Sequence, residues 1–314
     1  MGKFINPFTD MGFKRIFGQE FSKPLLLDFL NNLLKGERHI VDLRFLDKEQ
    51  PAEYVGDRSL IYDIYCETDN GDKIIVEMQN RDQPYFKNRS IYYISEAIAR
   101  QGERGSVWNY NIKAVYLVAF LNFTQDEIGS KFRTDVVLAD RESKETFSEM
   151  LRMVYLQLPY FQKEADACEN DFERWIYVLK NMETLNRMPW MAKNSLFERL
   201  SQIAEVGALS REERMKYDRS LKALRDTYSV YQGAVNEGLQ KGLEEGLQKG
   251  LQKGLEEGLQ KGMEEGLQKG LEEGRAEGRA ETNRENARKL KQLGVDLHTI
   301  AQATDLSVDE IAAL

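Results

Sequence analysis

The chain has 314 residues, of which 41% are hydrophobic and 31% charged, and its formal net charge is −8 at pH 7. This length and composition are typical of a globular protein of two domains, or of one domain with an extension. No apolar run is long enough to cross a membrane, and residues 1–7 lack the apolar core of a signal peptide. Cys66 and Cys168 lie too far apart in the sequence to predict a disulfide framework or a metal-ligand cluster. We therefore expect a cytoplasmic protein without a membrane segment.

The first 160 residues alternate between helix-like and strand-like patterns. Leucine and phenylalanine recur at helical spacing between Leu25 and Leu34, whereas residues 112–123 form a nearly continuous apolar run, as in a strand buried on both faces. The expected elements are, in chain order, a helix over 22–36, strands over 39–46, 60–66 and 73–79, a helix over 86–100, and strands over 112–123, 132–138 and 151–158. This α-β-β-β-α-β order, followed by further strands, predicts an α/β fold with a mixed sheet flanked by helices.

The rest of the chain is expected to be helical or repetitive. Residues 161–235 contain few strand signals and at least one amphipathic helix, around Phe172 to Leu179. From Gly238 to Gly278 a glycine recurs at every fourth position, between leucine, glutamine, lysine and glutamate. We therefore predict four regions: an α/β domain over 1–160, a helical subdomain over 161–235, a glycine-repeat tail over 236–281, and a small helical segment over 282–314.

The glycine repeat is a poor candidate for an isolated stable helix. Each glycine in a helix costs about 1 kcal/mol relative to alanine, whereas a Glu–Lys pair four residues apart returns only about 0.2–0.5 kcal/mol. We expect a spacer that is flexible, or that becomes helical when copies of the chain associate through it. A repeat without any role remains an alternative. The chain up to about Tyr231 is expected to fold without the repeat.

The stretch over residues 62–79 carries the clearest chemical signal. Asp63 lies in one expected strand and Glu77 in the next, where it follows three apolar residues. Side chains alternate along a strand, so Glu77 and Gln79 share one face. A carboxylate in such an apolar strand is costly to bury unless a cation compensates its charge.

The turn between these strands decides whether the two carboxylates meet. A two-residue turn at Asn70-Gly71 would place Asp63 and Glu77 on opposite faces. A three-residue loop pairs Thr68 with Asp72 instead, so that Asp63 lies opposite Glu77 and Gly71 takes a positive φ. The candidate site requires this second register.

These residues resemble the active-site pattern of the PD-(D/E)XK nucleases, in which an acidic residue is followed by Glu-x-Lys. One branch of these nucleases has Glu-x-Gln in place of Glu-x-Lys, as this chain does at Glu77 and Gln79. That branch comprises the PD-(D/E)XK nuclease family transposases, or recombination-promoting nucleases of the Rpn type. Residues 6–18 look like its N-terminal D-x-x-F-K-x-I-F-G signature, and residues 86–93 look like its following helix. The resemblance covers about residues 4–125 and implies a restriction-endonuclease-like core.

The resemblance also implies an activity: Mg²⁺-dependent hydrolysis of DNA phosphodiester bonds, linked to recombination or transposition. It assigns Asp63 and Glu77 as metal-binding catalytic carboxylates and the Met78 carbonyl as a further metal ligand. Gln79 occupies the position of the catalytic lysine, which is the main departure, because glutamine carries no charge. The accessory candidates are Asp10, Lys14, Arg89 and Gln101.

Simpler interpretations remain open. Asp63 and Glu77 could face solvent, and Asp10 and Lys14 could form a surface ion pair, since they lie four residues apart. Arg89 and Gln101 could belong to a solvated helix face. The acidic net charge also weighs against a dedicated nucleic-acid binder. The alternative function is a non-enzymatic DNA-associated or oligomerisation protein on a degenerate nuclease fold.

Overall fold

The computed structural model describes residues 2–50, 60–103, 108–191 and 194–314. The chain divides into two compact units, Met1–Tyr231 and Gln232–Leu314. The candidate active-site stretch lies wholly in the first unit.

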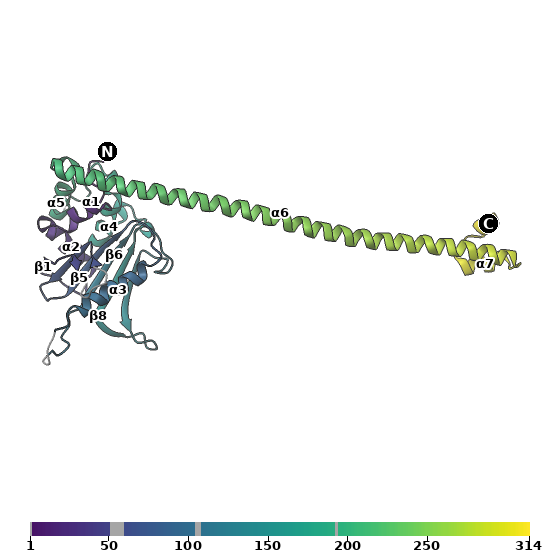
Figure 1. The fold of residues 1–314 in the computed structure, drawn as a ribbon, viewed down its shortest axis with the longest axis horizontal. Helices are drawn as coiled ribbons and strands as arrows, with labels where there is room; N and C mark the ends of the chain where they lie inside the picture. Colours follow the sequence, from purple (N-terminus) through teal and green to yellow (C-terminus); the bar gives the residue numbers. More distant parts are fainter. Residues whose placement is uncertain (1, 51–59, 104–107, 192–193) are drawn as a thin grey trace, which may run out of the picture. The chain divides into compact units, whose positions relative to one another are not determined.

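A six-stranded mixed sheet forms the centre of the first unit (Figure 1). Its strand order is β1-β4-β5-β6-β8-β7, in which β6 pairs in parallel with β5 and β8, and the other neighbours pair antiparallel. The strands are β1 Leu43–Phe45, β4 Ile64–Thr68, β5 Lys73–Gln79, β6 Val115–Leu121, β7 Arg133–Ala139 and β8 Thr146–Gln157. A separate ribbon pairs β2 Glu49–Gln50 with β3 Leu60–Ile61.

Helices cover both faces of this sheet. On one face, even-numbered residues of β5 and β6 such as Val76 and Phe120 join a large core with α1 Asp10–Phe17, α2 Lys23–Leu33, α4 Asp171–Asn181 and α5 Ser195–Ala204. On the other face, residues such as Ile75 and Leu117 pack against α3 Phe86–Ala99. Short 3₁₀ helices occur at Glu20–Ser22, Leu158–Tyr160, Ala165–Ala167, Met182–Thr184 and Val206–Ala208. The predicted α/β architecture, a mixed sheet flanked by helices, is confirmed.

The helices that follow the sheet in sequence share a core with those that precede it. Trp175 of α4 is fully buried, and its ring lies 5.9 Å from that of Phe17 in α1 and 6.2 Å from that of Phe29 in α2. Phe197 of α5 packs against the same tryptophan at 5.3 Å. The predicted helical region thus extends the layer that covers one face of the sheet.

The strand predicted over 60–66 is divided in the structure. Leu60–Ile61 pairs with β2, and the main-sheet strand begins only at Ile64. The N–H of Tyr62 donates to the carbonyl of Lys48, which directs this part of the chain away from β5. Asp63 therefore lies at the point where the chain enters the main sheet.

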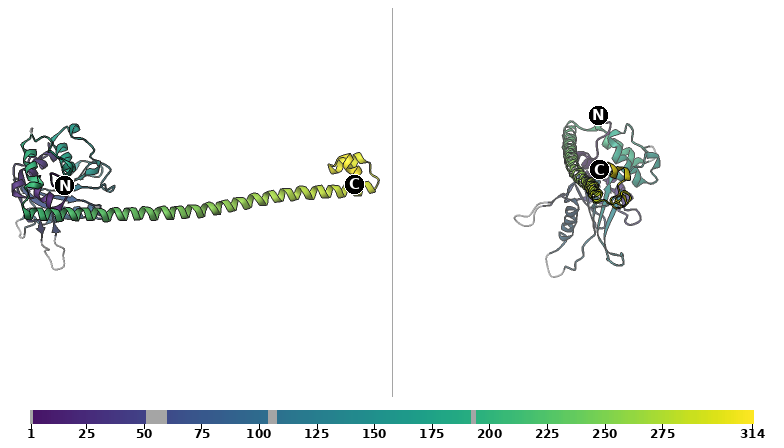
Figure 2. Two further views of the ribbon diagram at one scale, coloured as in Figure 1. Left: turned by 90° about the horizontal axis from the view of Figure 1, so that it is seen from above. Right: turned by 90° about the vertical axis from the view of Figure 1, so that its right-hand side faces the viewer.

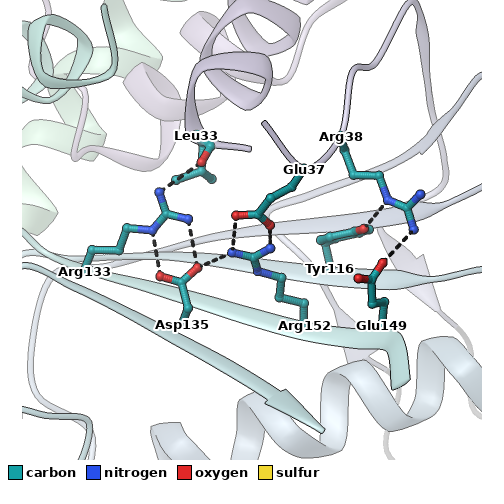
Figure 3. A network of polar contacts seen from close by, with 8 residues as sticks. All are labelled: Leu33, Glu37, Arg38, Tyr116, Arg133, Asp135, Glu149 and Arg152. Atoms are coloured by element: carbon teal, nitrogen blue, oxygen red, sulfur yellow. Dashed lines mark hydrogen bonds and ion pairs between the residues drawn. The ribbon is translucent and has the colours of Figure 1, made fainter. Parts of the chain in front are cut away.

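A polar network joins the end of α2 to the edge of the sheet (Figure 3). Arg152 of β8 forms ion pairs with Glu37 and, at 2.6 Å, with Asp135 of β7. Arg133 binds Asp135 at 2.7 Å and donates to the carbonyl of Leu33 at 3.0 Å. Because several charges share partners, this network orients the α2–β1 connection more firmly than isolated surface pairs would.

The second unit consists of most of α6, Arg211–Gln292, together with α7 Leu297–Thr304 and α8 Val308–Ala313. All repeat glycines lie within α6, where a Cβ at any of them would meet nothing within 4 Å, and Leu239 and Leu255 are each about three-quarters exposed. Ala287, Ile300 and Ile311 form a small core in which α7 and α8 pack against the end of α6 (Figure 2). In the described residues, no helix is both long and apolar enough to cross a membrane.

Candidate active site at the β4–β5 hairpin

The hairpin between β4 and β5 has the register that the candidate site requires. Thr68 donates to the carbonyl of Asp72 at 2.9 Å, and Gly71 has φ +86°. Ile64 pairs with Val76, and extending this register by one residue places Asp63 opposite Glu77. The predicted three-residue loop is confirmed.

The two carboxylates take part in hydrogen bonds where the backbone ladder ends. The Met78 N–H donates to Oδ2 of Asp63 at 2.8 Å, and the Asp63 N–H donates to Oε1 of Glu77 at 3.3 Å. Nε2 of Gln79 donates to Oε2 of Glu77 at 3.3 Å. Asp63, Glu77 and Gln79 therefore form one connected group, as the sequence pattern predicts.

Burial destabilises the charged forms of both acids. The side chain of Glu77 is only 3% exposed, and burial, together with the charge of Asp63, raises its pKa to about 8. Burial also raises the pKa of Asp63, although the Met78 N–H and the charge of Lys14 oppose this shift. The two groups compete for a proton, which Glu77, as the more buried of the two, retains more firmly. The interpretation of Glu77 as a solvent-facing residue is therefore wrong.

The accessory candidates lie in different surroundings. Lys14 and Asp10 form the ion pair suggested by their spacing, and the charges of both influence Asp63. Arg89 of α3 lowers the pKa of both site carboxyls, while its guanidinium lies over the rings of Phe86 and Tyr93 and donates to Gln83.

Gln101 takes part in a different set of contacts. Its amide accepts from the Lys113 N–H at 2.7 Å and donates to the Lys113 carbonyl at 3.1 Å. Gln101 lies two residues beyond the end of α3, whereas Arg89 lies in its first turn, so most of the length of the helix separates them. These bonds connect the end of α3 to the chain that enters β6.

The donor set fits a hard divalent cation. Such ions prefer carboxylate and carbonyl oxygens, and this site offers two facing carboxyl groups, both destabilised in their charged forms by burial, which a bound cation would offset. Across residues 2–50, 60–103, 108–191 and 194–314, no group of three or more acidic, histidine or cysteine side chains could hold a metal ion. The pair of Asp63 and Glu77 would therefore need a backbone carbonyl, such as that of Met78, and water to complete a coordination sphere.

A basic cavity of about 600 Å³ lies beside this site. The cations in its wall are Lys14, Arg15, Lys48, Lys216 and Arg219, against the two acids Asp10 and Glu213. Lys14 influences Asp63 directly, and the Lys48 carbonyl accepts the N–H of Tyr62, the residue before Asp63. The cavity therefore places positive charge next to the carboxylate pair in a chain whose overall charge is negative.

Three cations of this cavity, Lys48, Lys216 and Arg219, were not predicted from the sequence. They come from the β1–β2 connection and from α6, more than 160 residues apart in the chain. Lysines and arginines are frequent throughout this sequence, so no local pattern distinguishes these three. Only the packing of the start of α6 beside α1 brings them together.

A mixed sheet with an acidic hairpin at its centre, covered by helices on both faces, is the architecture of the PD-(D/E)XK nuclease fold. The family model for PD-(D/E)XK nuclease family transposases matches residues 7–234, which is most of the chain. The chain belongs to this family. Searches of curated proteins and of solved structures gave no match.

Proposed function

We propose that this protein is a divalent-cation-dependent endonuclease that hydrolyses phosphodiester bonds in DNA. The observation that carries the proposal is the pair Asp63 and Glu77, two facing carboxylates at the end of the β4–β5 ladder, one of them almost fully buried. A buried acid with a strongly raised pKa destabilises the folded state. Such residues are typical of functional sites, where their chemistry is needed. The family's name supports a place for this cleavage in DNA recombination or transposition.

In this proposal each side chain has a distinct task. Asp63 and Glu77 hold the cation, with Met78 contributing its carbonyl oxygen. When bound, Mg²⁺ supplies Lewis-acid polarisation of the phosphate and a lower pKa for attacking water. Gln79 orients water through its amide, which donates and accepts hydrogen bonds but adds no charge. Arg89 and Lys14 offset negative charge on the phosphate.

The second candidate is a non-enzymatic DNA-associated or oligomerisation protein on the same fold, and the observation that favours it is Gln79 at the lysine position. The deciding experiment is incubation of the purified full chain with plasmid DNA in Mg²⁺ and in EDTA. Nicking or linearisation that requires Mg²⁺ supports the endonuclease. Intact plasmid at all Mg²⁺ concentrations, with DNA binding retained, supports the non-enzymatic function.

Divalent cations should stabilise the folded protein. Mg²⁺ that binds only the folded state at one hundred times its Kd adds about 2.7 kcal/mol, which raises Tm by several degrees. The Asp63→Ala and Glu77→Ala variants should lose most of this rise, as followed by thermal unfolding with and without Mg²⁺. Equal rises in the wild type and in both variants would rule out this pair as the cation site.

The basic cavity should contribute to the affinity for DNA. Replacing Lys48 and Arg219 together by alanine should weaken the binding of a DNA duplex in EDTA by about ten-fold at 0.1 M salt. It should also reduce the slope of log K against log salt by about 2, because two phosphate contacts are lost. The matched control is Lys131→Ala with Lys222→Ala, which removes the same charge from exposed positions outside the cavity. An equal loss in the control would mean that only net charge matters.

A further inference from the structure

A second cavity, of about 520 Å³, opens where β5 and β6 end. Its wall contains residues 80–82, directly after β5, and Asn122 and Phe123, directly after β6. Residues 224–231 of α6 supply the remaining lining residues, among them Tyr228 and Tyr231. The volume lies in the range of about 300–1,000 Å³ that is usual for pockets that hold small organic groups.

The lining combines three kinds of chemistry. The apolar surface comes from aromatic rings and Leu224. Tyr228 and Tyr231 lie three residues apart on one side of α6, and their side chains are 63% and 48% exposed. Asn80, Asp82 and Asn122 offer amide and carboxylate groups. Arg81 and Arg225 add two cations.

One polar atom in this lining lacks a partner. Nδ2 of Asn80 donates to the Phe8 carbonyl at 2.5 Å, which sets the orientation of the amide. Its Oδ1 is buried and, among the described residues, receives no hydrogen bond. A buried acceptor without a donor is unfavourable for folding.

The cavity is also close to the proposed catalytic carboxylates along the chain. Asn80 follows Glu77 by three residues, which is about 10 Å along a strand. Bases stacked on one DNA strand are about 3.4 Å apart. Because Glu77 and residues 80–82 of the cavity wall all lie near the end of β5, a DNA strand with a phosphate at Asp63 and Glu77 that passes over this end of the strand would reach the cavity within a few nucleotides.

We infer that this cavity binds one unpaired DNA base next to the cleavage site. The rings of Tyr228 and Tyr231 stack on the base, the amide of Asn122 meets its polar edge, and Arg81 contacts the adjoining phosphate. Aromatic rings, amides and guanidinium groups together fit a nucleotide better than they fit a purely apolar ligand. The inference rests on the proposed function and adds that the preferred substrate has a single-stranded segment or a base that leaves the helix.

The test compares two single-stranded oligonucleotides of equal length bound by the full chain in EDTA, one with bases and one abasic throughout. The wild type should bind the strand with bases about ten-fold more tightly, because stacking adds to phosphate contacts that both strands share. In the double variant Tyr228→Ala with Tyr231→Ala, the two strands should bind with nearly equal affinity. The Tyr228→Phe variant should keep the ten-fold preference for the strand with bases. Arg81→Ala should weaken the binding of both strands alike and lower the salt dependence.

Phe147→Ala is the matched control, because Phe147 is 82% exposed on β8 and lies outside the cavity lining. Circular dichroism and Tm verify that each variant is folded. A wild-type ratio near one, or an unchanged ratio in the double tyrosine variant, overturns the inference. So does a double variant whose only change is its oligomeric state in light scattering, since the cavity would then be a contact between copies of the chain. Binding in EDTA is independent of the cleavage assay, so failure here is distinguishable from failure of the nuclease proposal.

Discussion

Replacing Glu77 by glutamine should lower Mg²⁺-dependent DNA cleavage by roughly 10³-fold. The substitution keeps the size of the side chain but removes one of the two facing negative charges that would hold the cation. A metal ion contributes several kcal/mol to a phosphoryl-transfer barrier, and each 1.36 kcal/mol corresponds to a factor of about ten in rate. The measurement is the initial rate of plasmid nicking across a range of Mg²⁺ concentrations.

Glu67→Gln provides the matched control for this prediction. Glu67 lies in β4 of the same hairpin, where it pairs with Arg44 and Lys73 rather than with the site. This control should cleave at nearly the wild-type rate. If the Glu77→Gln variant cleaves DNA at the wild-type rate, the pair of Asp63 and Glu77 is not the active site, and any nuclease activity of the protein arises elsewhere.

The same Glu77→Gln substitution should stabilise the fold in the absence of divalent cations. Burial first, and the charge of Asp63 second, raise the pKa of Glu77 from 4.5 to about 8. The folded state therefore keeps a proton that the unfolded chain releases as the pH rises through this window, so wild-type stability declines between about pH 4.5 and pH 8. A neutral amide avoids this loss.

The stabilisation should consequently depend on pH. In EDTA we expect the variant to have a Tm about 5 °C above that of the wild type at pH 8, with a difference that shrinks towards zero near pH 5. Thermal unfolding followed by circular dichroism between pH 5 and pH 9 measures both curves. A Tm difference that is constant with pH, or that grows as the pH falls, would contradict the burial of a carboxylate at this position. The combination of higher stability and lost cleavage would identify Glu77 as a residue retained for function.

The hairpin that carries the site could be predicted from sequence because its determinants are local. Gly71 tolerates the positive φ of a three-residue loop, and the period-2 pattern of the two strands then sets which side chains face each other. The register from Ile64–Val76 to Thr68–Asp72 is one of the two that these features permit. Chemistry provided a further constraint, since only this register brings Asp63 and Glu77 together.

Other parts of the structure depend on contacts between distant segments. The expected strand over 60–66 is interrupted because Tyr62 bonds to Lys48, and nothing within residues 60–66 indicates that partner. The expected strand over 39–46 shortens to Leu43–Phe45, where Thr68 to Cys66 provide its pairing partners. Strand length in a sheet depends on the partner as much as on propensity.

By itself, then, the sequence determined the elements whose signals lie within a few residues of one another: the apolar strands and the acidic hairpin. The glycine repeat, expected to be flexible or to become helical on association, lies within the continuous helix α6. The tertiary structure alone decided how deeply Glu77 is buried, and so how far its pKa rises, because that depends on α3 and on the neighbouring strand β6. It alone placed Lys48 beside Arg219, and Asn80 beside Tyr228. The physical reason is that burial and electrostatic fields depend on distances in space between segments, whereas propensity and periodicity describe only neighbours along the chain.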